Sequence, residues 1–270
     1  MSGAVTNTWF TDTLRLARAL PADVAPGILT DRYRERLGWT HASDHGASWI
    51  VFDGPSAVGK DTQIGLVTEW LNDHGLTVRT VGGTGGDTTL GPLIRALILR
   101  NATLAGASRW LADYRIKAAA WTALRGYAPV LRDADIVISN RGPLSQLVYS
   151  AVAGRRELLT DRRAVATAND AIRSSDLHLL LSCPDDVVVR RAQDRAASGE
   201  KRARKVDTPE FVAAANRAYH DLAAGLPWVR TVDVSRSREE NLASVKRLIE
   251  DALDLDTGKR ELLGRDGDAA

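Results

Sequence analysis

Five short, continuous runs of apolar residues recur along the chain, and segments with helical spacing separate them. The runs cover residues 49–52, 76–81, 136–139, 177–182 and 228–232. A run that is apolar at consecutive positions is typical of a parallel strand buried on both faces of its sheet. Segments that predict helices cover residues 62–72, 93–100, 108–124, 144–152, 187–197, 209–224 and 239–255. Strands that alternate with helices predict an α/β fold, in which a five-stranded parallel sheet is covered by helices on both faces.

The strand-forming part of the chain is flanked by two segments of different character. Residues 1–47 contain two short stretches with helical spacing and end in the polar, turn-like HASDHGAS, which predicts an N-terminal helical extension. Residues 48–256 hold every predicted strand and form one domain. Residues 257–270 end polar and small, and we expect them to be disordered. The role of the extension stays open between covering a binding site and forming a dimer contact.

Composition narrows the classes of protein that fit. The 270 residues include 36 basic and 34 acidic side chains, and this net charge of +2 argues against a general nucleic-acid or membrane-surface binder. Cys183 is the single cysteine, so no disulfide can form within the chain. The first residues lack a signal-peptide pattern, and no stretch reaches the roughly 20 apolar residues of a spanning helix. We therefore expect a soluble, cytoplasmic protein without nucleic-acid or membrane partners.

The first apolar run leads into GPSAVGK, residues 54–60, which has the G-x-x-x-x-G-K spacing of a phosphate-binding loop. A predicted strand precedes it and a predicted helix follows it. Glycines allow backbone N–H groups to converge on a phosphate, and the helix N-terminus attracts negative charge. We expect the lysine to contact the terminal phosphates of a nucleotide. The residues predicted to hold this nucleotide are Gly54, Ser56, Ala57, Val58, Gly59, Lys60, Asp61 and Thr62.

Oxygen-bearing side chains beside the loop predict a magnesium site. Asp61 stands where such loops usually carry Ser or Thr, and its carboxylate or the hydroxyl of Thr62 could coordinate the ion. The alternative for Asp61 is that an acidic residue stabilises the start of the helix. Asp53, directly before the loop, could hold Mg²⁺ through water or act as a base on an acceptor hydroxyl. The alternative for Asp53 is a strand-end cap.

Five later segments, read in order with the loop, resemble the thymidylate kinase-like branch of the P-loop nucleotide kinases. They are LGPLIRALIL, ADYRIKAAAW, IVISNRGPLSQLVYSA, LLLSCPDDVVVRRAQDR and DTPEFVAAANRAYHDLA. The likeness extends from about residue 48 to residue 255. It implies a P-loop kinase domain at residues 48–256 with a lid at about 195–206. It also implies ATP as phosphate donor, Mg²⁺, and a small-molecule acceptor.

The resemblance further implies which residues bind the acceptor. Two arginines match the family's arginines on the acceptor side, a tyrosine neighbours the first of them, and two more residues fall at substrate-facing positions. These residues are Tyr114, Arg115, Arg141, Ser145 and Tyr149.

The same comparison shows where this chain departs from the family. Asn140 replaces an Asp that follows the strand, and Ser56 replaces an Asp that often contacts a sugar. The turn around Gly83 consists of glycines and a threonine where the family carries an arginine. Asn140 and Gly83 remain candidate acceptor-binding positions. The departures predict a changed acceptor site beside a largely intact donor site.

Phosphoryl transfer requires neutralisation of negative charge, and residues 55–58 of the loop contain no arginine. The basic run at residues 190–205 is the expected source, because the resemblance places it at the lid and arginine forks fit phosphate oxygens. The alternative is a solvated basic face. The residues for which we expect catalytic roles are Asp53, Lys60, Arg141, Arg195, Arg202 and Arg204.

Together these patterns predict ATP-dependent, Mg-assisted phosphoryl transfer to a nucleotide, a nucleoside or a nucleoside-like metabolite. A non-nucleotide hydroxylated metabolite, as in a specialised-metabolism or self-resistance kinase, is the alternative acceptor. A nucleotide-binding protein with little or no kinase activity is the alternative function, because Asp61 and Asn140 both alter the metal site. Whether the chain forms a homodimer stays open.

Overall fold

The computed structural model describes residues 47–82, 134–154, 156–173, 175–198 and 208–253. The N-terminal extension, the C-terminal tail, the helices expected at 93–100 and 108–124, and residues 199–207 of the lid lie outside these ranges. The domain boundaries given above therefore stay predictions.

Five strands form one parallel sheet in the order β2-β3-β1-β4-β5. The strands are β1 (Ser48–Asp53), β2 (Val78–Gly82), β3 (Ile136–Asn140), β4 (Leu177–Ser182) and β5 (Val229–Asp233). β1 lies in the centre, and residues 49–53 are at most 2% exposed because helices cover both of its faces. This burial explains the continuous apolar run, and the predicted five-stranded parallel sheet is confirmed.

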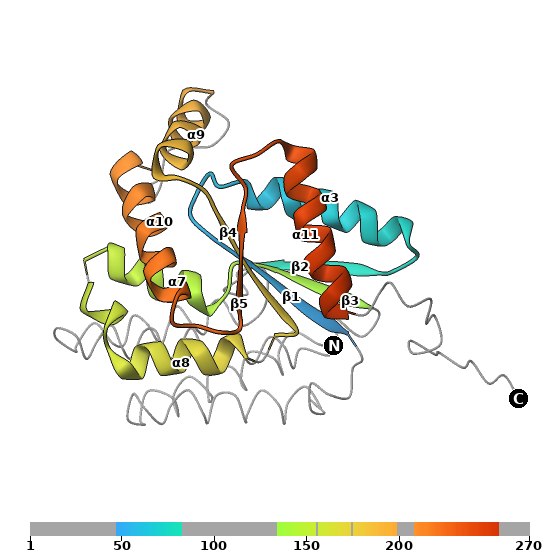
Figure 1. Cartoon of the computed structure of the whole chain (residues 1–270), viewed down its shortest axis with the longest axis horizontal. Helices are drawn as coiled ribbons and strands as arrows, with labels where there is room; N and C mark the ends of the chain where they lie inside the picture. Colours follow the sequence, from blue (N-terminus) through green and yellow to red (C-terminus); the bar gives the residue numbers. More distant parts are fainter. Residues whose placement is uncertain (1–46, 83–133, 155, 174, 199–207, 254–270) are drawn as a thin grey trace, which may run out of the picture.

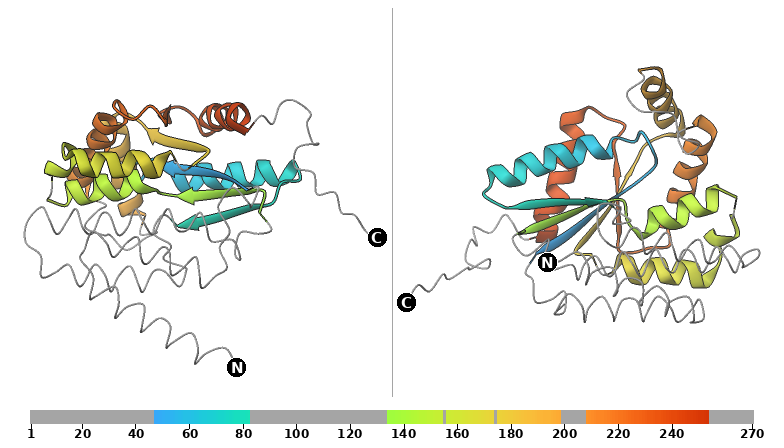
Figure 2. Two further views of the ribbon diagram at one scale, coloured as in Figure 1. Left: turned by 90° about the horizontal axis from the view of Figure 1, so that it is seen from below. Right: turned by 180° about the vertical axis from the view of Figure 1, so that it is seen from behind.

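Helices cover the two faces of the sheet as separate layers (Figures 1 and 2). Among the described residues, one layer contains α3 (Lys60–Asp73) and α11 (Arg238–Leu253). The other contains α7 (Pro143–Val152), α8 (Arg162–Ile172) and α10 (Pro209–Ala223). α9 (Asp185–Ala197) follows β4, packs on α10 and projects beyond the carboxyl end of the sheet (Figure 1). The lid segment predicted from sequence begins at the end of α9.

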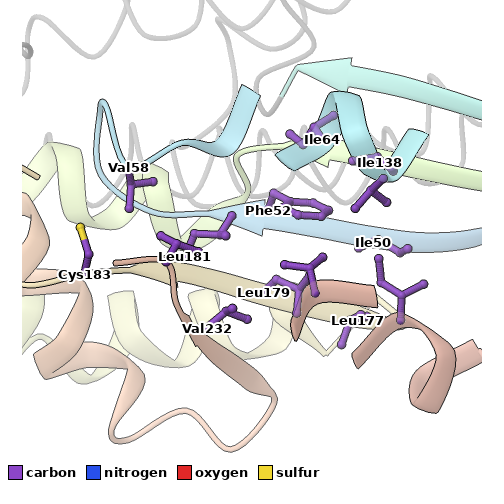
Figure 3. Close-up of a cluster of buried hydrophobic side chains, with 14 of the residues drawn as sticks. Ile50, Phe52, Val58, Ile64, Ile138, Leu177, Leu179, Leu181, Cys183 and Val232 are labelled. Atoms are coloured by element: carbon purple, nitrogen blue, oxygen red, sulfur yellow. The ribbon is translucent and has the colours of Figure 1, made fainter. Parts of the chain in front are cut away.

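Two hydrophobic cores hold these layers together. The core under α3 and α11 contains Ile50, Phe52 and Leu179 of the sheet, and Ile64 of α3 packs against them (Figure 3). The core on the opposite face contains Leu180 together with residues of α7, α8 and α10. Because successive strand residues point to opposite faces, a strand at the centre supplies both cores at once.

The order of the strands opens a crevice at the carboxyl edge of the sheet. β1 and β3 are neighbours, but the helix that follows β1 lies on one face and the helix that follows β3 lies on the other. The two turns therefore separate, and such a point in an open α/β sheet is where ligands bind. The turns after β1 and β3 are residues 54–59 and 141–142.

The described part of the chain contains two helices that the sequence analysis did not predict. These are the 3₁₀ helix η3 (Arg156–Leu159) and α8. Asp161 caps α8, because its Oδ1 accepts from the backbone N–H groups two and three residues later, at 2.8 and 3.1 Å. The buried face of α8 consists of Ala164, Ala168 and Ile172. Their four-residue spacing is helical, but two of the three are alanines and the apolar pattern is therefore weak.

Candidate active site

The turn after β1 requires glycine at its first position. Gly54 has a φ of 140°, and a Cβ added there would collide with the backbone oxygen of Leu181 in the adjacent β4. Gly59 closes the turn with a φ of 106°, and Ala57 is left-handed with a φ of 62°. Only glycine combines a positive φ with such a close approach to another backbone. The glycines of the motif thus determine the path of the loop.

The middle of the loop is anchored to the core and to a distant turn. The side chain of Val58 is 1% exposed and lies near Leu181 and Cys183 (Figure 3). Its carbonyl accepts a hydrogen bond of 3.2 Å from Nη1 of Arg191 in α9. Nη2 of Arg191 donates to the carbonyl of Val234, just after β5, at 3.0 Å. Arg191 therefore joins the phosphate loop to the turn between β5 and α11.

The loop leads directly into α3, whose N-cap residue is Gly59 and therefore offers no side chain to bond the first N–H groups of the helix. The first N–H groups of a helix have no partner within the helix, and its dipole places partial positive charge there. An anion is the natural partner for such a terminus. This arrangement supports the predicted phosphate site.

Two cationic side chains converge on one carbonyl beneath the loop. Nζ of Lys60 donates to the carbonyls of Gly54 and Pro55, at 2.9 and 2.6 Å. Nη1 of Arg141 donates to the same Gly54 oxygen at 3.0 Å. Burial, followed by the charge of Arg141, holds the pKa of Lys60 well below its ordinary value. A bound polyanion would favour the protonated lysine, so the site is electrostatically suited to phosphate groups.

Two departures from the family pattern contact each other. Nδ2 of Asn140, at the end of β3, donates to Oδ1 of Asp61, in the first turn of α3, at 2.8 Å. The hydrogen bond orients the Asp61 carboxylate at the edge of the pocket. A carboxylate with the hydroxyl of Thr62 next to it is a set of hard oxygen ligands, and these ligands fit Mg²⁺.

The last turn of α9 brings an arginine onto the loop. Nη2 of Arg195 donates to Oγ of Ser56 at 2.6 Å. Arg195 was predicted to act from the lid, and the structure places it beside the loop interior, which has no arginine of its own. Arg191, one turn earlier on the same helix, was part of the basic run in the sequence but was not singled out.

Asp53 lies at the end of β1 and is completely buried. Its Oδ1 accepts from the N–H of Gly142 at 3.1 Å and from the hydroxyl of Ser145, and its Oδ2 accepts from Nε2 of His178 at 2.8 Å. Burial alone would raise the pKa of Asp53, but these hydrogen bonds, that of His178 first, lower it below its ordinary value. Such occupied, buried oxygens favour the strand-end role over that of base or metal ligand.

The residues expected to face the acceptor take different places. Ser145 is 3% exposed and bonds to Asp53 and Tyr219, so it lies under the site rather than in it. Tyr149 supports the arginine of the turn, because the guanidinium carbon of Arg141 lies 4.7 Å from the centre of its ring. Arg141 itself has a φ of 79°, a left-handed conformation in which the β3–α7 turn points its side chain back to the phosphate loop.

One pocket of about 530 Å³ gathers the phosphate loop and the arginines. It is lined by Ser56, Ala57, Gly59, Lys60, Asp61, Thr62, Gly82, Asn140, Arg141, Arg191 and Arg195. The pocket therefore brings together predicted donor-site residues, Asn140 and Arg141 from the acceptor side, and one lid arginine. Gly83, Tyr114, Arg115, Arg202 and Arg204 lie outside the described residues, and their roles stay predictions.

Comparison with known proteins decides the family. A family model described as "Thymidylate kinase" matches residues 52–245. The chain belongs to the thymidylate kinase family. A thymidylate kinase of Symbiobacterium thermophilum is 31% identical over 208 residues, which cover 76% of this chain and 94% of the relative. A probable thymidylate kinase of Pyrococcus horikoshii is 28% identical over 222 residues, which cover 80% and 98%.

Membership of the thymidylate kinase family confirms the predicted resemblance, the P-loop kinase fold and the class of ATP-dependent kinases. The family uses nucleotides and ATP, so the coarse prediction of nucleotide phosphorylation with ATP also holds. Within the described residues, every helix is too short or too polar to cross a membrane.

Proposed function

We propose that this thymidylate kinase family member transfers a phosphoryl group from ATP to a nucleoside monophosphate, with thymidylate as the first acceptor to test. The observation that carries this proposal is the pocket that Lys60, Arg141, Arg191 and Arg195 line together with the first residues of α3. Four cationic side chains in one crevice match the charge of donor and acceptor phosphates together. The acceptor candidate comes from the names of the relatives.

The donor phosphates occupy the loop. Backbone N–H groups at the start of α3 bind their oxygens, and Lys60 exchanges its hydrogen bonds to the loop carbonyls for bonds to phosphate. Arg195 leaves Ser56 and binds the transferring phosphoryl group, whose negative charge is spread over its equatorial oxygens in the transition state. Positioning and charge neutralisation are the main protein contributions in this chemistry.

The acceptor phosphate binds at Arg141. The guanidinium is fixed by the Gly54 carbonyl and by the ring of Tyr149, so it loses little freedom when a phosphate arrives. In the free protein Lys60 and Arg141 donate to the same Gly54 carbonyl, so the donor-side lysine and the acceptor-side arginine lie next to each other before the substrates bind.

Asp61 and Thr62 are the residues that would hold Mg²⁺. Asn140 keeps the Asp61 carboxylate in place by its hydrogen bond of 2.8 Å. When bound, the ion supplies positive charge to the donor phosphates. The chain thus retains one carboxylate at this site but carries it on α3, whereas the family pattern places it after β3.

The test is ATP consumption with Mg²⁺ against a panel of nucleoside monophosphates, nucleosides and unrelated hydroxylated metabolites, with products resolved by mass. We expect thymidine diphosphate from thymidylate. Transfer to a different acceptor alone would show that Ser56, Asn140 and the glycine turn mark a re-specified pocket. ATP binding without any product would favour the non-catalytic alternative.

A matched pair of lysine variants ties the activity to the loop. Lys60→Ala should abolish transfer, whereas Lys246→Ala should not, because Lys246 lies on α11 over the ring of Trp70 and away from the pocket. Near-normal turnover by Lys60→Ala would refute the mechanism.

A further inference from the structure

A chain of buried polar side chains lies beneath the two turns of the site. It consists of His178 in β4, Asp53 at the end of β1, Ser145 in α7 and Tyr219 in α10. Their exposed fractions are 1%, 0%, 3% and 0%. Apart from Asp53 and Ser145, sequence analysis gave these residues no role. None of the four lines the pocket, so the chain does not contact the substrates directly.

The hydrogen bonds of this chain run in a defined direction. Nε2 of His178 donates to one oxygen of the Asp53 carboxylate at 2.8 Å. The hydroxyl of Ser145 donates its proton to the other oxygen, so the hydroxyl of Tyr219 must donate to Ser145 Oγ, at 2.6 Å. Both branches end on Asp53, the residue that directly precedes the phosphate loop.

Asp53 also holds the second turn. Its Oδ1 accepts from the backbone N–H of Gly142, and Gly142 follows Arg141. A Cβ on Gly142 would lie 2.7 Å from Val51, 3.2 Å from Asp53 Oδ2 and 3.4 Å from the His178 ring. The turn thus rests directly on the Asp53–His178 pair, with no room for a side chain between them. The N–H of Arg141 bonds to the carbonyl of Phe52 at 2.9 Å.

We propose that His178 is a positioning residue for phosphoryl transfer, which acts through Asp53 to fix both the phosphate loop and the turn that aims Arg141. This inference rests on the proposed function. His178 reaches the loop through the Asp53–Gly54 peptide and reaches the arginine through the Asp53–Gly142 hydrogen bond. The imidazole of His178 therefore fixes the position of the phosphate loop relative to the turn that carries Arg141.

Stability alone does not account for a histidine at this position. The strand reads Leu-His-Leu-Leu-Leu, and leucines fill the buried positions on either side of His178. Nδ1 of His178 has no hydrogen-bond partner among the described residues, so its contact with Asp53 is the polar interaction that the ring makes there. Burying polar groups costs free energy even where they are hydrogen-bonded, and well-packed apolar residues of similar volume often stabilise a fold as well. A polar pair kept in this place is better explained by the geometry that it imposes.

The experiment compares three variants of the full chain with the wild type. His178→Leu removes the donor to Asp53, and His178→Gln keeps an amide N–H near the position of Nε2. Leu180→Val is the matched control, because Leu180 is a buried residue on the same face of β4 and lies opposite Asp53 in the sheet, but its side chain cannot hydrogen-bond to the carboxylate. We measure the Kd of ATP with Mg²⁺ by calorimetry, the KM of thymidylate, and the thermal midpoint of each protein.

We expect His178→Leu to weaken ATP binding and to raise the thymidylate KM, each about 10- to 100-fold, because a hydrogen bond to a buried carboxylate is lost. His178→Gln should restore most of both values, and Leu180→Val should change neither beyond twofold. Equal binding by His178→Leu and the wild type would overturn the inference. So would a His178→Gln protein as weak as His178→Leu.

Two further outcomes separate the inference from its premise. Wild-type protein that does not bind ATP would overturn the proposed function and the inference with it. If His178→Leu does not fold, His178→Asn tests the same contact, since it keeps a polar side chain whose amide lies near the position of Nδ1 and falls short of Nε2, the atom that bonds to Asp53. A His178→Asn protein with unchanged ATP and thymidylate constants would then overturn the inference, and weakened constants would support it.

Discussion

Replacing Asp61 with Asn is the sharpest test of the altered metal site. The change keeps the size of the side chain and removes its charge. Two unit charges 4 Å apart attract by about 1 kcal/mol in water and about 4 kcal/mol at the effective dielectric of a protein surface. Asp61 is exposed, so its attraction lies toward the aqueous value, although the ion is divalent. We expect a loss of about 2 kcal/mol, or roughly 30-fold in the Mg²⁺ concentration for half-maximal turnover.

The assay needs a control and a readout that does not depend on turnover. Asp73→Asn removes a carboxylate from the opposite end of the same helix and should leave the Mg²⁺ dependence unchanged. Binding of Mn²⁺ in the presence of ADP, followed by electron paramagnetic resonance, reports on the ion directly. The double variant D61N/N140D moves the carboxylate to β3 and keeps one amide and one acid in contact, so it should regain most of the lost affinity. Overlapping Mg²⁺ and Mn²⁺ titrations for D61N and D73N would refute the assignment of Asp61 as a ligand of the metal ion. Asp61 would then be a helix-start residue only.

Three further predictions concern the loop and the arginine that meets it. Since burial lowers the pKa of Lys60 and a bound triphosphate would raise it, ATP binding should take up a proton. The affinity for ATP should then weaken by up to roughly tenfold per pH unit as the pH rises above the pKa of Lys60 in the free protein. Calorimetry in buffers of different ionisation enthalpy measures the proton uptake, and an affinity that does not change with pH would contradict this prediction. Arg195→Ala should lower kcat roughly 100- to 1,000-fold with little change in ATP affinity. An equal loss of kcat in Ser56→Ala would show that the Arg195–Ser56 hydrogen bond of the free enzyme matters rather than the charge of Arg195. Gly54→Ala should lower the thermal midpoint and the affinity for ATP, because the added Cβ meets the backbone of β4. Gly65→Ala, with open space around its Cβ within a helix, should raise the midpoint slightly. Equal midpoints for the two variants would contradict the requirement for glycine at position 54.

The fold could be predicted because its signals are local. Parallel strands buried on both faces leave continuous apolar runs, and each predicted run coincides with a strand to within two residues. α8 was missed for the opposite reason. Its buried face rests on alanines, and the capping Asp161 stands in a stretch of charged residues where one more acid carries little information.

The residues of the candidate site also fall into two groups, those with a local signal in the sequence and those without one. Gly54 and Lys60 belong to a contiguous motif whose spacing encodes its own geometry. Arg191 contacts Val58, which lies 133 positions earlier in the chain, and His178 contacts Asp53, 125 positions earlier. No local sequence pattern contains such distant pairs. His178 did leave one sign, because a histidine within a run of leucines predicts a buried polar partner. The partner itself could be found only once β1 and β4 were known to be neighbours.

The departures from the family pattern acquire a meaning from these contacts. In the sequence Asp61, Asn140 and Ser56 are separate substitutions: Asp61 and Asn140 motivate the non-catalytic alternative, whereas Ser56 and Asn140 predict a changed acceptor site. In the structure the first two share a hydrogen bond, and the third accepts one from Arg195. Unrelated substitutions would not be expected to contact each other, whereas the Asp61 carboxylate on α3 bonds to the Asn140 amide that stands at the acidic position of the family pattern after β3. A double-mutant cycle on Asp61 and Asn140 should therefore give a coupling energy above about 0.5 kcal/mol in Mg²⁺-dependent turnover. Additive effects would mean that the two substitutions arose without reference to each other, and the case for a re-specified working site would lose this support.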